Sequence, residues 1–237
     1  MQQRPPIDFN IQLTPLTKKL LIGILVAYVL ELIIGQTVLS LNDFAWFPAD
    51  NFKLWQPITH FFVLDLAPNF SPMRFLLSLL GIVFFMPPVE QNFRSKGLGR
   101  LLALTIGISI AFGALCSVTT IAYQGVAYGI ESYIVALLTV FCFLRPSAQI
   151  LLFFILPIKA EWIGWFTGLI SFLYLIANRD MGAAVQLAGW FAGLVFLAQK
   201  KKGPLKRIYK KTIGKPRAAK TPFKIIQGGK DDGDIFH

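Results

Sequence analysis

The sequence has 237 residues, of which 55% are hydrophobic and only 15% are charged, and its mean hydropathy is +0.60. Soluble domains average about a quarter charged residues, so this composition excludes a soluble globular domain and predicts a membrane protein. The net charge is +11, and residues 200–237 carry 12 Lys or Arg against 3 Asp, so +9 of it lies in the last 38 residues.

Six apolar segments are candidates for membrane-spanning helices, because a helix needs about 20 apolar residues to cross about 30 Å of hydrocarbon. They are residues 20–39, 75–89, 101–122, 128–143, 161–177 and 182–198. The first is too long for the apolar region of a signal peptide and is predicted to be retained. The second is short and is predicted to end at Pro87-Pro88, with an extension back to Pro72, since proline suits a first helical turn.

Two connecting segments are more apolar than ordinary loops. Residues 40–73 are rich in aromatic side chains and predict short amphipathic helices lying in the membrane interface, although an ordinary belt of interfacial aromatic residues would look similar. The aromatic side chains concerned are Trp46, Phe47, Trp55, Phe61 and Phe62. The stretch "ILLFFILP" is too short to cross as a helix, and we expect an extended interfacial segment between Arg145 and Lys159.

Charges in the loops predict the orientation of the chain. With six spans, four groups of basic residues fall on one side of the membrane, which makes both termini cytoplasmic. These groups precede the first span, follow the second, separate the fourth from the fifth and form the tail. The predicted organisation is a cytoplasmic segment at residues 1–17, a membrane domain at 18–199 and a disordered basic tail at 200–237. Such a tail predicts contact with anionic lipid rather than with nucleic acid.

Two motifs in the first half of the chain carry a family resemblance. "LWQPITHFF" resembles the tryptophan-arginine motif in the first loop of rhomboid intramembrane proteases, with Trp55 in place and Gln56 where arginine is usual. "FLLSLLGIVFFMPPVEQNF" resembles the second rhomboid helix, which ends in a glutamate that Glu90 matches. Ser78 falls where the family has an asparagine that supports the oxyanion hole.

The last two motifs align with the catalytic positions of that family. Active rhomboids have a serine in a Gly-x-Ser-Gly turn on the fourth helix and a histidine before small residues on the sixth. Here "GIESYIVALL" places Gly129 at the first glycine, Glu131 at the serine and Ser132 at the second glycine. "VQLAGWFAGL" places Gln186 at the histidine and keeps Gly189 and Gly193, which let helix backbones approach closely.

These substitutions predict that the family's chemistry is absent. A serine hydroxyl needs an adjacent base, and the amide of Gln186 is not basic. Ser132 is offset from the nucleophile position by about 100° around a helix, and adjacent helical residues do not face each other, so Glu131 cannot serve Ser132 as a base. We therefore expect no catalytic residue, and a hydrogen bond between Glu131 and Gln186 that links two helices. The alternative is that Glu131 faces water without a partner.

The resemblance implies an all-α, six-helix rhomboid-like bundle with a half-embedded first loop. It also implies a pseudoprotease, similar to derlins in outline, that binds transmembrane clients beside the second and fifth helices as an adaptor, chaperone or quality-control protein. The loop residues expected to contact the membrane or clients are Trp46, Phe47, Trp55, Gln56 and Phe61. No cofactor or metal is predicted, and a bacterial inner membrane is the expected location. Two alternatives stay open: a serine protease with a non-standard site, and proton or ion transport through Glu31 and Glu131.

Overall fold

The computed structural model describes residues 13–34, 44–45, 53, 55–63, 72–118, 127, 129–152 and 156–200. Its elements are α1 (Pro15–Ile34), α2 (Gln56–Thr59), the 3-10 helix η2 (His60–Phe62), α3 (Pro72–Val118), α4 (Glu131–Leu144), β1 (Gln149–Leu152), β2 (Leu156–Lys159), α5 (Ala160–Asn178) and α6 (Met181–Gln199). The described part is thus mostly helical, as predicted, with one small two-stranded sheet.

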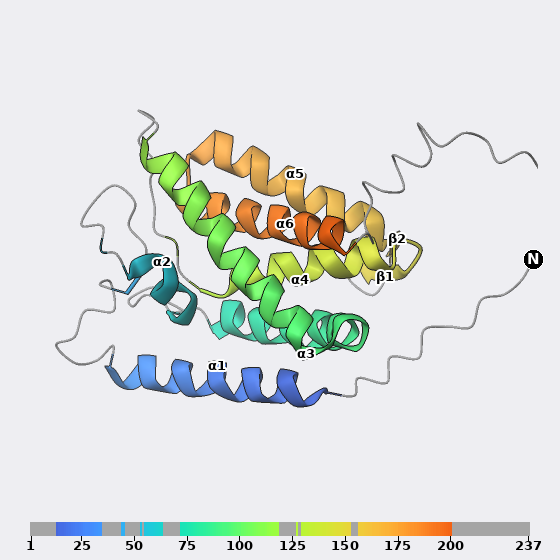
Figure 1. The fold of residues 1–237 in the computed structure, drawn as a ribbon, viewed down its shortest axis with the longest axis horizontal. Coiled ribbons are helices and arrows are strands. Elements are labelled where there is room, and N and C mark those ends of the chain that lie inside the picture. The colour runs from blue at the N-terminus through green and yellow to red at the C-terminus, as the bar shows by residue number, and fades with distance from the viewer. Residues whose placement is uncertain are drawn as a thin grey trace, which may run out of the picture.

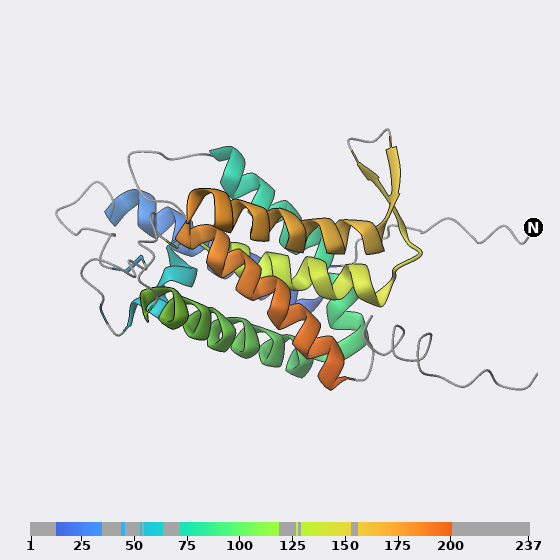
Figure 2. The ribbon, with the colours of Figure 1, turned by 90° about the horizontal axis from the view of Figure 1, so that it is seen from above.

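The helices form a bundle around α4 (Figures 1 and 2). The most extensive contacts of α4 are with α6 and α3, and α5 also packs against it. The first helix lies at the edge of the bundle and packs on α3, where the rings of Tyr28 and Phe75 stack with centroids 3.8 Å apart. The ends of the bundle differ: one holds the start of α1, the hairpin and the end of α6, and the other holds α2, the start of α4 and the α5–α6 turn (Figures 1 and 2).

The long element α3 consists of two helices joined by a sharp reversal at Arg94, where φ is 59° and ψ is 172°. This corrects the prediction that the second span ends at Pro87-Pro88, because the helix continues through both prolines. Prolines are tolerated in membrane helices when the freed backbone groups find other partners. The carbonyls that lose their helical donors at Pro87 and Pro88 are those one turn earlier, of Val83 and Phe84. The predicted start at Pro72 is confirmed.

Three helical stretches within the described residues are long and apolar enough to cross a membrane: residues 75–115 of α3, α5 and α6. The apolar helix α4 has only 14 residues, and α1 carries three charged side chains, Lys18, Lys19 and Glu31. The predicted bounds of α5 and α6 are met within one residue, while α4 begins at Glu131 instead of residue 128. Residues 35–39 and 119–122 of the predicted spans lie outside the described residues. The count of six spans stays a prediction.

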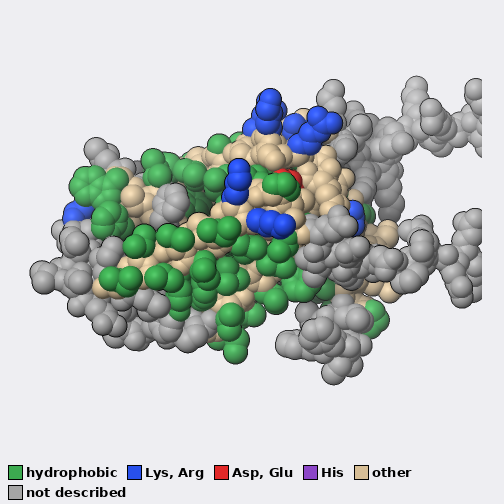
Figure 3. Space-filling view, turned by 90° about the horizontal axis from the view of Figure 1, so that it is seen from below, with side chains coloured by type: hydrophobic (Ala, Val, Ile, Leu, Met, Phe, Trp, Pro, Cys, Tyr) green, Lys and Arg blue, Asp and Glu red, His purple; other side chains and the backbone are tan. Residues whose placement is uncertain are grey.

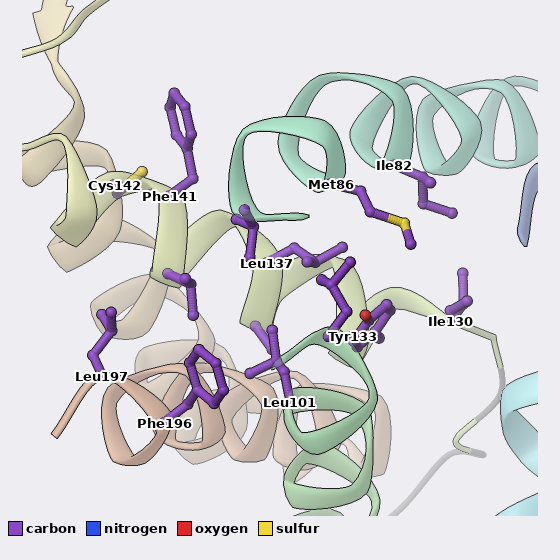
Figure 4. Close-up of a cluster of buried hydrophobic side chains, with 14 of the residues drawn as sticks. Ile82, Met86, Leu101, Ile130, Tyr133, Leu137, Phe141, Cys142, Phe196 and Leu197 are labelled. Carbon is purple, nitrogen blue, oxygen red and sulfur yellow. The ribbon is translucent and has the colours of Figure 1, made fainter. Parts of the chain in front are cut away.

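Buried apolar side chains from several helices meet around α4 (Figure 4). Tyr133 and Leu137 of α4 contribute to a cluster that also contains Met86 and Leu101 from α3 and Phe196 from α6. By contrast, α1 and α5 expose most of their large apolar side chains, and α5 buries only Ala160, Gly164, Gly168 and Ser171. An apolar outer surface over a packed interior is what a lipid solvent requires of a helical bundle.

The segment between α4 and α5 forms a β-hairpin. Strands β1 and β2 pair antiparallel, with Gln149 opposite Lys159 and Leu152 opposite Leu156. The predicted extended conformation is confirmed for residues 149–152 and 156–159, while residues 153–155 lie outside the described residues. The base of the hairpin is tied to the neighbouring helices, since the amide of Ala148 donates to the carbonyl of Arg145 and the amide of Ala160 donates to the carbonyl of Ala148.

Candidate functional site

The turn before α4 positions the first polar residues of that helix. Gly129 has a φ of 88°, a conformation that side chains disfavour, and its backbone amide donates to the carbonyl oxygen of His60 at 2.8 Å. This bond joins the first loop to the start of α4. The helix then begins at Glu131, three residues later than its apolar sequence suggests, because the chain must first complete the glycine turn.

Glu131 and Gln186 touch at the end of the bundle away from the hairpin. The Gln186 amide nitrogen Nε2 donates to Glu131 Oε2 at 2.8 Å, and both side chains are half-buried. The predicted contact between these two residues is confirmed. A carboxylate and a neutral amide in this arrangement can hold two helices together, and the amide of Gln186 is not basic near neutral pH, so it cannot replace the imidazole of a histidine.

Ser132, the next residue on α4, is not hydrogen-bonded to this pair. Its hydroxyl oxygen is buried and has no hydrogen-bond partner among the residues that the structure describes. The side chain of Ser132 is 1% exposed. This arrangement agrees with the offset of about 100° expected for the residue after Glu131 on a helix.

Glycines bring α6 against α4 at this point. A Cβ atom placed on Gly189 would lie 2.1 Å from the carbonyl oxygen of Ser132, and one on Gly193 would lie 2.8 Å from Cβ of Thr139. The predicted close packing at Gly189 and Gly193 is confirmed. The same contact aligns Gln186, one turn before Gly189 on α6, with Glu131 at the start of α4.

Ser78 lies on α3, one turn before Gly81. A Cβ atom placed on Gly81 would come within 2.8 Å of Ile134 on α4, so this part of α3 packs near the start of α4. Ser78 itself is half-buried, and in the described part of the chain no hydrogen bond joins it to Glu131 or Gln186. Its predicted place near the site is consistent with this packing, whereas a supporting role for its hydroxyl stays a prediction.

The first loop differs from the prediction at two of its five residues. Trp55 is 51% exposed and agrees with a membrane- or client-facing role, but Gln56 and Phe61 are buried. The prediction that Gln56 and Phe61 face the membrane or clients is therefore wrong, because Gln56 Oε1 accepts from the backbone amide of Lys53 and Phe61 packs in the core. Trp46 and Phe47 lie outside the described residues.

Glu90 forms a second polar site at the opposite end of the bundle. Its Oε2 accepts from the hydroxyls of Thr14 and Thr17, and its Oε1 accepts from the hydroxyl of Ser95 at 3.1 Å. The carboxylate is 7% exposed and thereby joins the start of α1 to both halves of α3. Glu90 was predicted from the sequence but its partners were not, although two threonines three residues apart at the start of an apolar helix are a local signal for a polar contact.

Residues 51–202, more than half of the chain, match the family model described as the rhomboid domain. The chain belongs to the rhomboid family. The match contains Glu90, Glu131 and Gln186 and omits only α1 among the long helices. Membership together with the apolar helices makes the chain an integral membrane protein with a rhomboid domain. No curated protein matches the sequence.

We expect the substitution Gln186→Leu in this rhomboid domain to lower the free energy of unfolding by about 1 kcal/mol, because Glu131 loses one donor and both groups are only half-buried. A double-mutant cycle with Glu131→Leu isolates the pairwise energy, since Glu131 also contributes as an acidic residue in the first turn of α4. Thermal unfolding in detergent provides the measurement. The exposed Gln199→Leu on the same helix is the control, and a coupling energy of zero would contradict a structural link.

Proposed function

We propose that this rhomboid-family chain is a pseudoprotease that binds transmembrane or membrane-associated clients without cleaving them. The observation that carries the proposal is the 2.8 Å hydrogen bond from Gln186 to Glu131. By their resemblance to the family's motifs, these residues occupy the places of the histidine and the serine. Serine catalysis of the family's kind needs a serine hydroxyl and a histidine within hydrogen-bond reach, and this pair supplies neither of those two groups.

The hydroxyl of Ser132 supports the same conclusion. An activated serine must contact both a base and the substrate carbonyl, whereas the hydroxyl of Ser132 is buried and has no hydrogen-bond partner among the described residues. Its backbone is in contact with Gly189, so rotation of α4 to expose this hydroxyl would force the two helices apart. This packing argues against a non-standard protease in which Ser132 replaces the lost nucleophile.

The outer helices support binding of membrane clients. α3 and α5 both pack on α4, and within the described residues they make at most marginal contact with each other. Both also present large apolar side chains, such as Leu77 on α3 at 59% exposure and Leu173 on α5 at 55%. A second helix can pack against such surfaces in lipid by van der Waals contact, without the water-driven force that operates in soluble proteins.

The charge distribution supports an orientation with both termini in the cytoplasm, and the proposed location remains a bacterial inner membrane. The end of the bundle that holds the start of α1 and the hairpin carries the exposed Lys18, Lys19, Arg94, Lys96, Arg100, Arg145 and Lys159. The opposite end carries Glu131 and Asp180 beside Lys53 and Arg179. Excess Lys and Arg near helix ends mark the cytoplasmic side. The tail that would add to this charge lies outside the described residues.

The proposal is tested with the full chain in lipid vesicles together with a defined single-span model client. We expect no labelling by a fluorophosphonate probe, no difference between the native chain and Ser132→Ala, and an intact client. A photocrosslinking amino acid at Leu77 or Leu173 is expected to capture the client, and the same group at Ile22 on α1 is the control. Labelling that is lost in Ser132→Ala, or a cleaved client, would show an active protease. Equal capture from Ile22 would argue against a client site at α3 and α5.

A further inference from the structure

The hairpin between α4 and α5 leaves the bundle sideways. In Figure 2 its two strands run across the direction of the helices and extend beyond the outline of α5, and in Figure 1 they are seen nearly end-on. A bundle that spans a bilayer has its helices roughly along the membrane normal, so strands that cross them run along the membrane surface. The hairpin therefore lies parallel to one leaflet at the basic end of the molecule.

Two properties of the strands determine how deep they can lie. Six of their eight residues are apolar, and Pro157 is exposed, which disfavours a position in water. However, a two-stranded sheet has two unpaired edges, and open edges do not occur in the hydrocarbon region of a membrane. Only the interfacial region satisfies both requirements, because it offers apolar contact on one side and water or headgroup oxygens for the unpaired backbone groups.

The base of the hairpin carries two exposed cations, Arg145 and Lys159. They lie close together along the backbone, since Ala148 is hydrogen-bonded both to Arg145 and to Ala160, the residue after Lys159. One acidic residue, Glu161, is near them on the first turn of α5 and is half-buried. Among the described residues, the base of the hairpin thus carries two cations and one carboxylate. It lies at the end of the bundle where most exposed Lys and Arg side chains are found.

Further cations lie near Arg145 and Lys159 at this end of the bundle. Arg94, Lys96 and Arg100 follow the reversal in α3 and are all exposed, while the other nearby carboxylate, Glu90, is buried among hydroxyl groups. Figure 3 shows Lys and Arg side chains gathered toward one side of a face whose remaining described surface is largely hydrophobic. This arrangement complements a leaflet whose headgroups carry phosphate.

From this geometry we infer that the hairpin lies in the headgroup region of one leaflet and that Arg145 and Lys159 bind the phosphate of an acidic phospholipid. The hairpin's base is hydrogen-bonded to the start of α5, so a lipid held there would also set the depth of α5 in the bilayer. This lipid site lies within the membrane domain and does not depend on whether the chain binds clients.

The location of the strands is tested with a single reporter on the full chain. Cys116 and Cys142 are replaced by alanine, Pro157 is replaced by cysteine and labelled with the fluorophore NBD, and the protein is reconstituted into phosphatidylcholine vesicles. We expect blue-shifted emission that a shallow spin-labelled lipid quenches more strongly than a deep one. Emission typical of water, with full quenching by iodide, would overturn the inference.

The lipid preference is tested by adding phosphatidylglycerol that carries a headgroup spin label. We expect stronger quenching of the NBD group than with the matching phosphatidylcholine. Each of Arg145→Gln and Lys159→Gln removes one cation near an anionic surface. Each should therefore lower the enrichment of phosphatidylglycerol around the NBD group about five-fold. Arg179→Gln, at the opposite end of the bundle, should leave it unchanged. Because all three side chains are exposed, these variants are expected to fold. The same preference in the Arg145→Gln/Lys159→Gln double variant would overturn the lipid site.

Discussion

Replacing Gly189 by alanine is expected to lower the free energy of unfolding by about 3 kcal/mol, or to prevent folding, because the added methyl group overpacks the α4–α6 contact. The new Cβ atom would lie 2.1 Å from the carbonyl oxygen of Ser132 and 2.8 Å from its carbonyl carbon. Both are backbone atoms of a helix and cannot rotate out of the way. The two helices would have to separate, which would also lengthen the hydrogen bond between Gln186 and Glu131.

Two other glycines provide a graded comparison. Gly193→Ala meets the side chain of Thr139 at 2.8 Å and the carbonyl oxygen of Ala136 at 3.0 Å, so it should cost less than Gly189→Ala. Gly107→Ala meets nothing within 4 Å on the exposed side of α3 and should be neutral or stabilising by up to about 1 kcal/mol. Thermal unfolding of the three variants in the same detergent measures the order of their stabilities. Equal stability of all three would contradict the close contact of α4 with α6.

Replacing Glu90 by alanine is expected to lower the free energy of unfolding by about 3 kcal/mol, since it removes a buried acceptor and leaves a cavity. Its two oxygens accept from hydroxyls on α1 and on the second half of α3, so the loss affects three helical segments at once. Glu90→Gln should cost less, because it retains one acceptor oxygen but loses the one facing Thr14 and Thr17.

The neighbouring residue supplies the control for Glu90. Gln91 is exposed on the same turn, and Gln91→Ala should change stability by no more than about 0.5 kcal/mol. Thr14→Val removes one hydroxyl donor and should cause an intermediate loss of about 1 kcal/mol. If Glu90→Ala and Gln91→Ala unfold at the same temperature, the carboxylate does not hold α1 to α3.

The contact between Glu131 and Gln186 was predictable through the resemblance to the rhomboid motifs. These motifs place Glu131 at the family's serine and Gln186 at its histidine, two groups that must lie within hydrogen-bond reach in an active member. The bounds of α5 and α6 were predictable from the sequence itself, since apolar length decides where a membrane helix begins and ends.

The features that were missed depend on contacts between distant segments. Nothing near Phe61 in the chain indicates that its ring packs in the core instead of the membrane surface, because both environments are apolar. Thr14 and Thr17 both fall within the predicted cytoplasmic segment, yet Thr14 directly precedes α1, Thr17 lies in its first turn, and both donate to Glu90. A reversal between residues 89 and 101 was predicted, but its position at Arg94 was not, since the two prolines give a stronger local signal for the end of the helix.

The central helix α4 has a consequence for how the chain enters the membrane. With 14 residues at about 1.5 Å each, α4 is about 21 Å long, which is shorter than a hydrocarbon layer of about 30 Å. Insertion machinery selects segments by apolar length, so we expect α4 to partition poorly by itself and to be retained only when α5 and α6 follow it into the bilayer. The polar pair at the start of α4 would then form late in biogenesis, after synthesis of α6 is complete.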